Sequence, residues 1–259
     1  MSHSTLVEQS NIQERPTTQE VKRSDEASLW ACVLAEGLGT FGLVFAGCGA
    51  IMIDAISHGQ ITHVGVGLVF GLIITVMIYA FGHISGAHFN PAVTLGFVLT
   101  SHFPVRRLWV YWGAQLIGAT LASLCLRWLL GDVVHLGATL PSGSGGAWQS
   151  FVLEVLLTFF LMVVIMAMST DTRAVGQAAA LAIGATVALE ALFAGPISGA
   201  SMNPARSLAP ALVSFTWTAQ WVYLSAPFLG ASAGALVYRW MREAGTLPLP
   251  ASAQEEHHD

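Results

Sequence analysis

The chain contains one thirteen-residue phrase twice. GHISGAHFNPAVT occupies residues 82–94, and GPISGASMNPARS occupies residues 195–207, so the second copy begins 113 residues after the first. Eight of the thirteen positions are identical. One difference changes the chemistry, because Arg206 stands where the first copy has Val93. A repeat of this kind predicts two structurally related halves within one chain.

The composition indicates a protein of the lipid bilayer. Of the 259 residues, 54% are hydrophobic and 10% are charged, whereas an average soluble domain has about 25% charged residues. The mean hydropathy is +0.64. The net charge of −5 comes largely from the polar ends, so it gives no reason to expect a nucleic-acid partner. Cys32, Cys48 and Cys125 lie in apolar stretches without metal-ligand spacing, and we expect them to be buried free thiols.

Six stretches are long and apolar enough to cross a membrane as helices, which takes about 20 residues for about 30 Å of hydrocarbon. They are residues 29–53, 62–81, 108–130, 148–168, 175–194 and 219–241. Two further apolar segments, roughly 90–99 and 203–213, are too short, because ten helical residues rise about 15 Å. Each short segment begins at or beside the Asn of one copy of the phrase. The sequence therefore predicts an all-α membrane protein with six transmembrane helices and two re-entrant half-helices.

Basic residues predict the orientation of these spans. The tail before the first span, alternate loops and the end of the last span carry Lys22, Arg23, Arg106, Arg107, Arg173, Arg239 and Arg242, whereas loops 54–61 and 131–147 contain no Lys or Arg. Since cytoplasmic loops are enriched in these residues, both termini are predicted to be cytoplasmic, with the chain in the plasma (inner) membrane. Arg127, at the outer end of the third span, is an exception that can snorkel to the interface.

This pattern divides the chain into a membrane domain, residues 27–242, and two polar tails, residues 1–26 and 243–259, which we expect to be disordered. The membrane domain itself repeats. Glu36 and Glu154 each stand four residues before the Thr of a Thr-Phe pair, in the first and fourth spans. Each half then has three spans, and because three is odd, the halves insert in opposite orientations. The prediction is an inverted repeat, in which one half-helix enters the membrane from each side.

The Asn-Pro-Ala triplets, Asn90-Pro91-Ala92 and Asn203-Pro204-Ala205, predict where the half-helices start. Asn is a favoured N-cap, and Pro is favoured at the first helical position. Non-helical backbone at membrane depth is tolerated where it is buried in protein or lines a wet cavity. Two helix N-termini, each with a partial charge of about +0.5, would then face the membrane centre together with two amide side chains. Such a site suits neutral polar solutes and repels cations.

These features together resemble the aquaporin, or major intrinsic protein, family over residues 27–242: twin Asn-Pro-Ala boxes, Glu in the first and fourth spans, and Arg after the second box. The phrases are most similar to those of the nodulin-like intrinsic proteins and their bacterial relatives. The resemblance implies a homotetramer with one pore per subunit. It also implies that Glu36 and Glu154 hold and orient the backbone of the half-helix loops.

The resemblance further places a narrow selectivity filter outside the boxes. Gapless alignment through the second box places the fifth-span position of this filter at Ala191 and its loop position at Ala200. The second-span position falls on Phe70, and the arginine of the filter is Arg206. Water-selective relatives typically have His at the position of Ala191, so we expect a wider constriction here. We expect Arg206 to point into the pore and to donate to carbonyl groups of the loop around Ile197–Ala200. Ser207, directly after the arginine, is typical of water channels and not of glycerol channels, so the landmarks are mixed.

The interpretation is a passive channel for water and small uncharged solutes, such as glycerol, urea and undissociated metalloid hydroxides including arsenite, which excludes ions and protons. One alternative is a strictly water-selective channel. A proton-coupled secondary transporter would also have inverted repeats, but it needs a coupling site, and Glu36, Glu154 and Glu190 have no partner recognisable in the sequence. No acid–base pair, nucleophile set or metal-spaced cluster stands out, so we expect neither an enzyme nor a cofactor or metal. The expected partners are water, small neutral solutes and membrane lipid.

Overall fold

The computed structural model describes residues 28–142, 144–170 and 178–244. In these ranges the chain is helical, and six helices are long and apolar enough to cross a membrane. They are α2 (Leu29–Ile56), α3 (Thr62–Ser85), α5 (Leu108–Leu130), α7 (Gly146–Thr170), α8 (Ala179–Ser198) and α10 (Gln220–Ala244). Each of the six predicted spans overlaps one of these helices, although residues 175–177 of the fifth lie outside the described residues. The fold class predicted from the sequence is confirmed.

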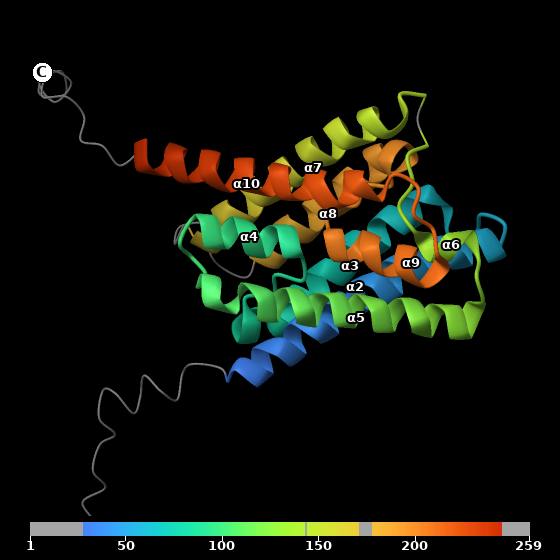
Figure 1. The fold of residues 1–259 in the computed structure, drawn as a ribbon, viewed down its shortest axis with the longest axis horizontal. Helices are drawn as coiled ribbons and strands as arrows, with labels where there is room; N and C mark the ends of the chain where they lie inside the picture. The colour runs from blue at the N-terminus through green and yellow to red at the C-terminus, as the bar shows by residue number, and fades with distance from the viewer. Residues whose placement is uncertain (1–27, 143, 171–177, 245–259) are drawn as a thin grey trace, which may run out of the picture.

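The helices lie side by side, with both described ends of the chain at one end of the bundle. Figure 1 shows the start of α2 and the end of α10 at the left, whereas the loop between α2 and α3 lies at the right. Most of the helices are a few residues longer than the predicted spans. Helix α2, with 28 residues, is about 42 Å long at 1.5 Å per residue. Apolar residues predict the part of a helix inside the hydrocarbon, but the backbone remains helical beyond it.

Two short helices enter the bundle from opposite ends. Helix α4 (Pro91–Leu99) and helix α9 (Pro204–Ser214) each begin directly after an Asn of the repeated phrase. The Asn90 side chain accepts from the Ala92 N–H at 2.9 Å, and the Asn203 side chain accepts from the Ala205 N–H at 3.0 Å. Because α3 ends at Ser85 and α8 at Ser198, neither short helix continues a transmembrane helix. The predicted half-helices are therefore present.

The links into the half-helices have matching, unusual backbones. In the first link Gly86, Ala87 and Phe89 have φ values of 86°, 51° and 50°, and in the second Gly199, Ala200 and Met202 have values of 83°, 41° and 54°. Residues with side chains rarely adopt this left-handed region and occupy it when the surroundings over-determine it. The agreement between links shows that the two halves share a backbone geometry as well as a sequence.

Glycine allows the closest helix contacts in both halves. A Cβ atom on Gly118 of α5 would lie 2.1 Å from the Gly37 carbonyl oxygen of α2, and one on Gly230 of α10 would lie 2.3 Å from the Val155 oxygen of α7. Between α3 and α8, a Cβ on Gly71 would lie 2.5 Å from the Gly184 oxygen. These backbones touch directly, as small residues permit in membrane bundles.

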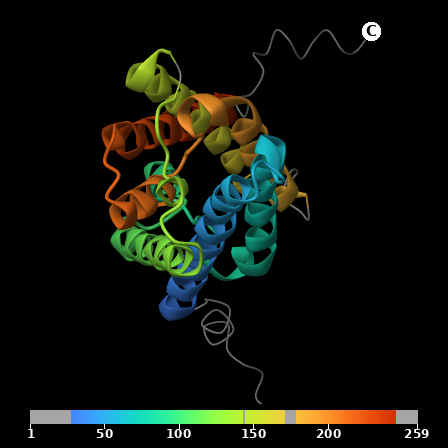
Figure 2. The ribbon, with the colours of Figure 1, turned by 90° about the vertical axis from the view of Figure 1, so that its right-hand side faces the viewer.

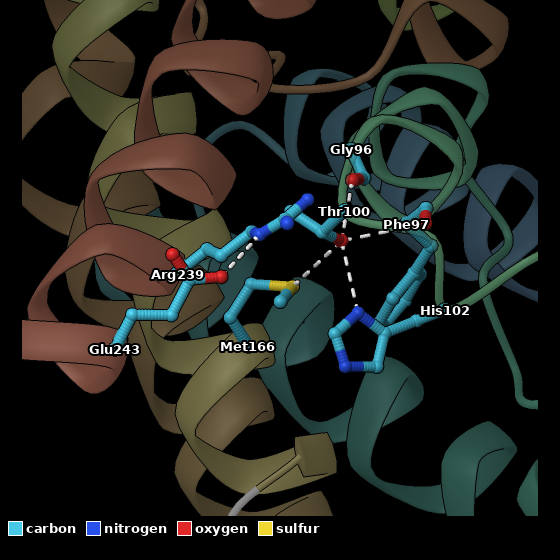
Figure 3. A network of polar contacts seen from close by, with 7 residues as sticks. All are labelled: Gly96, Phe97, Thr100, His102, Met166, Arg239 and Glu243. Carbon is cyan, nitrogen blue, oxygen red and sulfur yellow. Dashed lines mark hydrogen bonds and ion pairs between the residues drawn. The ribbon is translucent and has the colours of Figure 1, made fainter. Parts of the chain in front are cut away.

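A polar cluster lies at the C-terminal end of α4, away from the N-terminal end that follows Asn90 (Figure 3). The Thr100 hydroxyl lies 3.0 Å from the Gly96 carbonyl oxygen and 3.1 Å from Nδ1 of His102, with Sδ of Met166 at 3.9 Å. Beside it, Arg239 pairs with Glu243 on α10 at 2.7 Å. The Thr100 hydroxyl thus adds a side-chain donor to the Gly96 and Phe97 carbonyls in the last turn of α4, which also accept from backbone N–H groups that follow the helix.

At the other end, the chain between α5 and α7 makes a turn that the sequence analysis did not predict. In segment α6 (Val134–Gly137) four consecutive residues, Val134, His135, Leu136 and Gly137, have φ values of 41°, 53°, 56° and 68°. A left-handed conformation costs about 1–2 kcal/mol for each residue with a side chain. Leu136 is fully buried against α2, α5 and α9, and this burial holds the turn in place.

Candidate pore

Two buried carboxylates hold the backbone of the links in the same way. Both oxygens of Glu36 accept, from the His88 N–H at 2.9 Å and the Phe89 N–H at 2.7 Å. Glu154 accepts from the Ser201 and Met202 N–H groups, each at 2.8 Å. A carboxylate has two acceptor oxygens and can satisfy two adjacent N–H groups of a link that cannot pair within a helix. The carboxylates thereby fix the links that lead to both half-helices.

A serine and a tyrosine complete each of these attachments. Ser85 donates its hydroxyl to Glu36 at 2.7 Å, and its carbonyl accepts from the Tyr111 hydroxyl at 2.8 Å. In the second half Ser198 donates to Glu154 at 2.7 Å, and its carbonyl accepts from Tyr223 at 2.6 Å. The sequence analysis missed these four residues. The serines stand inside the repeated phrase. The tyrosines lie outside it, and no pattern in the sequence relates one tyrosine to the other or to its serine.

The first half adds one amide that the second lacks. Gln115 of α5 donates through Nε2 to Glu36 at 2.8 Å and lies 3.1 Å from the Thr94 hydroxyl. The offset that relates Tyr111 to Tyr223 would place its equivalent at Pro227, which has no donor. Gln115 was also not singled out from the sequence, since a lone Gln in an apolar span has no partner that can be read there.

The two Asn-Pro-Ala boxes meet through reciprocal hydrogen bonds. Asn90 donates Nδ2 to the Met202 carbonyl at 2.7 Å, and Asn203 donates Nδ2 to the Phe89 carbonyl at 2.9 Å. Each side chain also caps its own half-helix through its oxygen. An amide nitrogen carries two hydrogens, so each Asn keeps one donor. Both asparagines line a central cavity, whereas Pro91, Ala92, Pro204 and Ala205 are buried behind them.

The central cavity and a second cavity share the four residues assigned to the filter. The central cavity has a volume of about 120 Å³ and extends to Ser169 and Ala179. The second cavity, of about 250 Å³, reaches Asp54 near the C-terminal end of α2 and His63 near the N-terminal end of α3. Phe70, Ala191, Ala200 and Arg206 line both cavities, and no other described residue does so. The passage between the cavities is therefore bounded by an aromatic ring, two methyl groups and a guanidinium.

Arg206 is held differently from the expectation. It is 2% exposed, its Nη1 donates to the Gly137 carbonyl at 2.9 Å, and its Cζ lies 5.0 Å from the centre of the Phe70 ring. The sequence analysis placed its acceptor in the loop Ile197–Ala200, and this assignment is wrong. In that loop the Ile197 carbonyl accepts from Ser142 and Ser150, and the Ser198 carbonyl accepts from Tyr223. The left-handed turn before Ala138 instead directs the Gly137 carbonyl at the guanidinium.

Val93, the counterpart of Arg206, lines the central cavity with an apolar side chain. Glu190, named above among the candidate coupling residues of a transporter, is 3% exposed and lines neither cavity. Within the described ranges its Oε2 has no hydrogen-bond partner. Its place next to Ala191 in the chain therefore does not put its carboxylate in the passage.

The constriction between two cavities, with paired half-helices that start at the membrane centre, defines a membrane channel, and comparison with known proteins gives the same class. The family model described as major intrinsic protein matches residues 23–238. Aquaporin NIP1-1 of Zea mays is 55% identical over 211 residues, which cover 81% of this chain and 74% of the relative. Nodulin-26 of Glycine max is 45% identical over 230 residues, 87% of this chain and 84% of the relative.

A solved structure agrees with these relatives. The X-ray structure of the aquaglyceroporin from Plasmodium falciparum superposes with a TM-score of 0.76 at 26% identity, covering 82% of this chain and 96% of that one. The chain belongs to the major intrinsic protein family, and the resemblance found in the sequence is confirmed. It is a multi-pass membrane protein and a passive channel of the aquaporin type for water and small solutes, not an enzyme.

Proposed function

We propose that this channel passes small uncharged solutes wider than water, among them glycerol, urea and undissociated metalloid hydroxides such as arsenite, and that it excludes ions and protons. The observation that carries the proposal is the passage shared by the two cavities. Two of its four side chains, Ala191 and Ala200, end at a methyl group. The missing side-chain volume leaves room for a solute with several hydroxyl groups.

The remaining two walls favour a solute with one polar and one less polar side. Arg206 keeps donors that Gly137 does not occupy, since a guanidinium has five N–H groups. Phe70 offers an apolar face beside it. A polyol or a trihydroxy metalloid can accept from the guanidinium and lie against the ring. The aquaglyceroporin name of the structural neighbour also supports a range that includes glycerol.

Charged species meet a barrier that does not depend on width. A cation would lose its hydration shell beside Arg206, whose guanidinium is positively charged. It would then meet the N-terminal ends of α4 and α9, which carry partial positive charge. A water molecule that accepts from both asparagines turns its hydrogens outward, and this orientation interrupts a proton wire.

The proposal extends to assembly and location. We infer a homotetramer with one pore per subunit in the plasma (inner) membrane, with both termini cytoplasmic. The support for the tetramer is family membership. The support for the orientation is that Arg106, Arg107, Arg239 and Arg242 lie at the same end of the bundle, since basic residues are enriched on the cytoplasmic side.

The experiment is stopped-flow light scattering on proteoliposomes challenged in turn with sucrose, glycerol and urea. The native channel should pass water, glycerol and urea. Ala191→His should place a ring in the passage and reduce glycerol flux about tenfold, the effect of about 1.4 kcal/mol added to the barrier, with a much smaller loss of water flux. Val187→His, on the same face of α8 but at the central cavity only, serves as the control.

Three outcomes would exclude parts of the proposal. Equal loss of water and glycerol flux in Ala191→His would mean that residue 191 does not bound the narrowest point. A native channel that passes water and no larger solute would be the strictly water-selective alternative. Saturable, proton-dependent solute uptake would favour the secondary transporter.

A further inference from the structure

Cys48 on α2 stands directly behind the guanidinium of Arg206. Nη1 of Arg206 lies 3.5 Å from Sγ of Cys48, and the same Sγ lies 3.8 Å from the Gly137 carbonyl oxygen. That oxygen also accepts from Nη1 at 2.9 Å. The thiol, the carbonyl and the guanidinium therefore form a closed triangle of contacts. The thiol is fully buried, and neither Cys48 nor Gly137 lines either cavity.

Gly137 fits against Cys48 without spare room. A Cβ atom at position 137 would lie 3.1 Å from both Cα and Cβ of Cys48 and 3.2 Å from its carbonyl oxygen. Gly137 also has a φ of +68°, which glycine adopts at no steric cost. The carbonyl can reach Arg206 because the turn packs directly against α2 at Gly137.

Burial and a second hydrogen bond fix the turn on both sides of Gly137. Leu136 has 0% exposure in a cluster with residues of α2, α5 and α9. Thr139 donates its hydroxyl to that of Ser207, the residue after Arg206, at 2.7 Å. Figure 2, which looks onto this end of the molecule, shows the chain after α5 crossing the middle of the helix ring.

We propose that Cys48, acting together with the left-handed turn Val134–Gly137, is a positioning residue that sets where the Arg206 guanidinium stands, and that it thereby helps to determine which solutes pass. The inference rests on the proposed function, because it concerns the same passage. The thiol contributes in two ways: it accepts from the guanidinium, and it donates to the carbonyl that the guanidinium also uses. Arg206 then has a fixed rear side at Nη1, while the residue still lines both cavities.

Loss of the thiol should release the guanidinium toward the lumen. In Cys48→Ala the Gly137 oxygen remains, but both contacts of the thiol are gone, the one that accepts from Nη1 and the one that donates to that oxygen. A guanidinium that moves into the passage obstructs a polyol more than a water molecule. We expect the ratio of glycerol to water permeability to fall about fivefold, the effect of one ordinary hydrogen bond. Cys48→Ser keeps a donor and acceptor at this site and should restore most of the ratio.

Cys32 provides the matched control. It lies on the same helix, it is buried, and its thiol also donates to a backbone carbonyl, that of Ile84 at 3.3 Å. It lies near the inner end of α2 and does not contact Arg206. Cys32→Ala should leave the glycerol-to-water ratio unchanged, so an effect confined to Cys48→Ala cannot come from a general loss of packing in α2.

The test combines flux with a structure. Glycerol and water permeabilities of the full-length protein and the three variants are measured in proteoliposomes, and Cys48→Ala is imaged by electron cryomicroscopy in lipid nanodiscs. The expected structure shows the guanidinium displaced from the Gly137 oxygen. An unchanged Arg206 in that structure, or equal ratios for Cys48→Ala and Cys32→Ala, would overturn the inference. A wild-type channel impermeable to glycerol would instead refute the proposed function, and the position of Arg206 would still decide the role of Cys48.

Discussion

Arg206 shows how one side chain can change a channel whose halves are otherwise alike. Both copies of the phrase supply an Asn, a Pro and a cap to a half-helix, but one copy alone supplies a permanent charge. That charge is 2% exposed and faces an aromatic ring at 5.0 Å. Burying a guanidinium is costly unless its donors find acceptors. The acceptor from the turn before Ala138 therefore makes the charge at the passage possible.

Replacement of this charge should weaken the exclusion of cations. In Arg206→Val the passage keeps its methyl groups and gains width, while the fixed positive charge is lost. We expect proton conductance to rise about tenfold or more, since removal of about 1.4 kcal/mol from a barrier gives one factor of ten. A pH-sensitive dye inside proteoliposomes measures the leak. Arg127→Val, at the half-exposed arginine on the outer end of α5, is the control, and an unchanged leak in Arg206→Val would contradict an electrostatic role.

At this scale, the sequence predicted residues whose roles are local. An N-cap is decided by the residue and its immediate successors, so Asn90 and Asn203 could be assigned from the phrase. The partners of Arg206 and Glu36 could not be assigned in this way. Gly137 is 69 positions from Arg206, and Gln115 is 79 positions from Glu36. No local pattern encodes contacts of this range.

The links and half-helices form the next scale, and they depend on the two carboxylates. Each link has left-handed residues and N–H groups that no helix satisfies, and Glu36 or Glu154 accepts from two of them. A buried N–H group without a partner costs about 1–3 kcal/mol. The links therefore hold their shape because a carboxylate on a neighbouring helix faces them.

Glu154→Gln should destabilise the second link. Glutamine offers one acceptor oxygen and an amide NH2 group in place of two oxygens, so the N–H of either Ser201 or Met202 would face a donor. We expect a loss of about 2–3 kcal/mol in stability, seen as a lower midpoint of thermal unfolding in detergent, together with reduced water permeability. Glu190→Gln is the control, because Oε2 of this buried carboxylate has no hydrogen-bond partner among the described residues. Equal effects of the two substitutions would contradict the holding role of Glu154.

Element by element, the sequence predicted what periodicity and length can encode. Six apolar runs of about 20 residues or more predicted the six spans. Two further apolar runs were too short to cross the membrane, and they predicted the two half-helices. The turn Val134–Gly137 could not be predicted, because its residues have no intrinsic preference for left-handed backbone. Its conformation depends on a cavity that other helices provide for Leu136.

For the whole molecule, the inverted repeat explains why the two halves close on each other at one point. Asn90 donates to Met202 of the second link, and Asn203 donates to Phe89 of the first. The bonds are reciprocal because the halves are related by an axis in the membrane plane. The same relation places α4 and α9 with their N-terminal ends together, which opposes cations from either side. An even number of spans then brings both ends of the chain to one face.

The orientation of that face can be tested on the intact protein. Arg106, Arg107, Arg239 and Arg242 lie at the end of the bundle where the described chain begins and ends (Figure 1), and the loops at the other end lack Lys and Arg. Since positive residues near the ends of spans are retained in the cytoplasm, a tag added after Asp259 should face inward. Protease added to inside-out vesicles should remove the tag, and protease added to right-side-out vesicles should leave it intact.

Arg106→Glu combined with Arg107→Glu should make insertion less uniform, whereas charge reversal at Arg127, on the outer side, should not. If the tag on the otherwise unchanged protein were cleaved from outside, the predicted orientation would be reversed. The cavity beside Asp54 and His63 would then open to the cytoplasm.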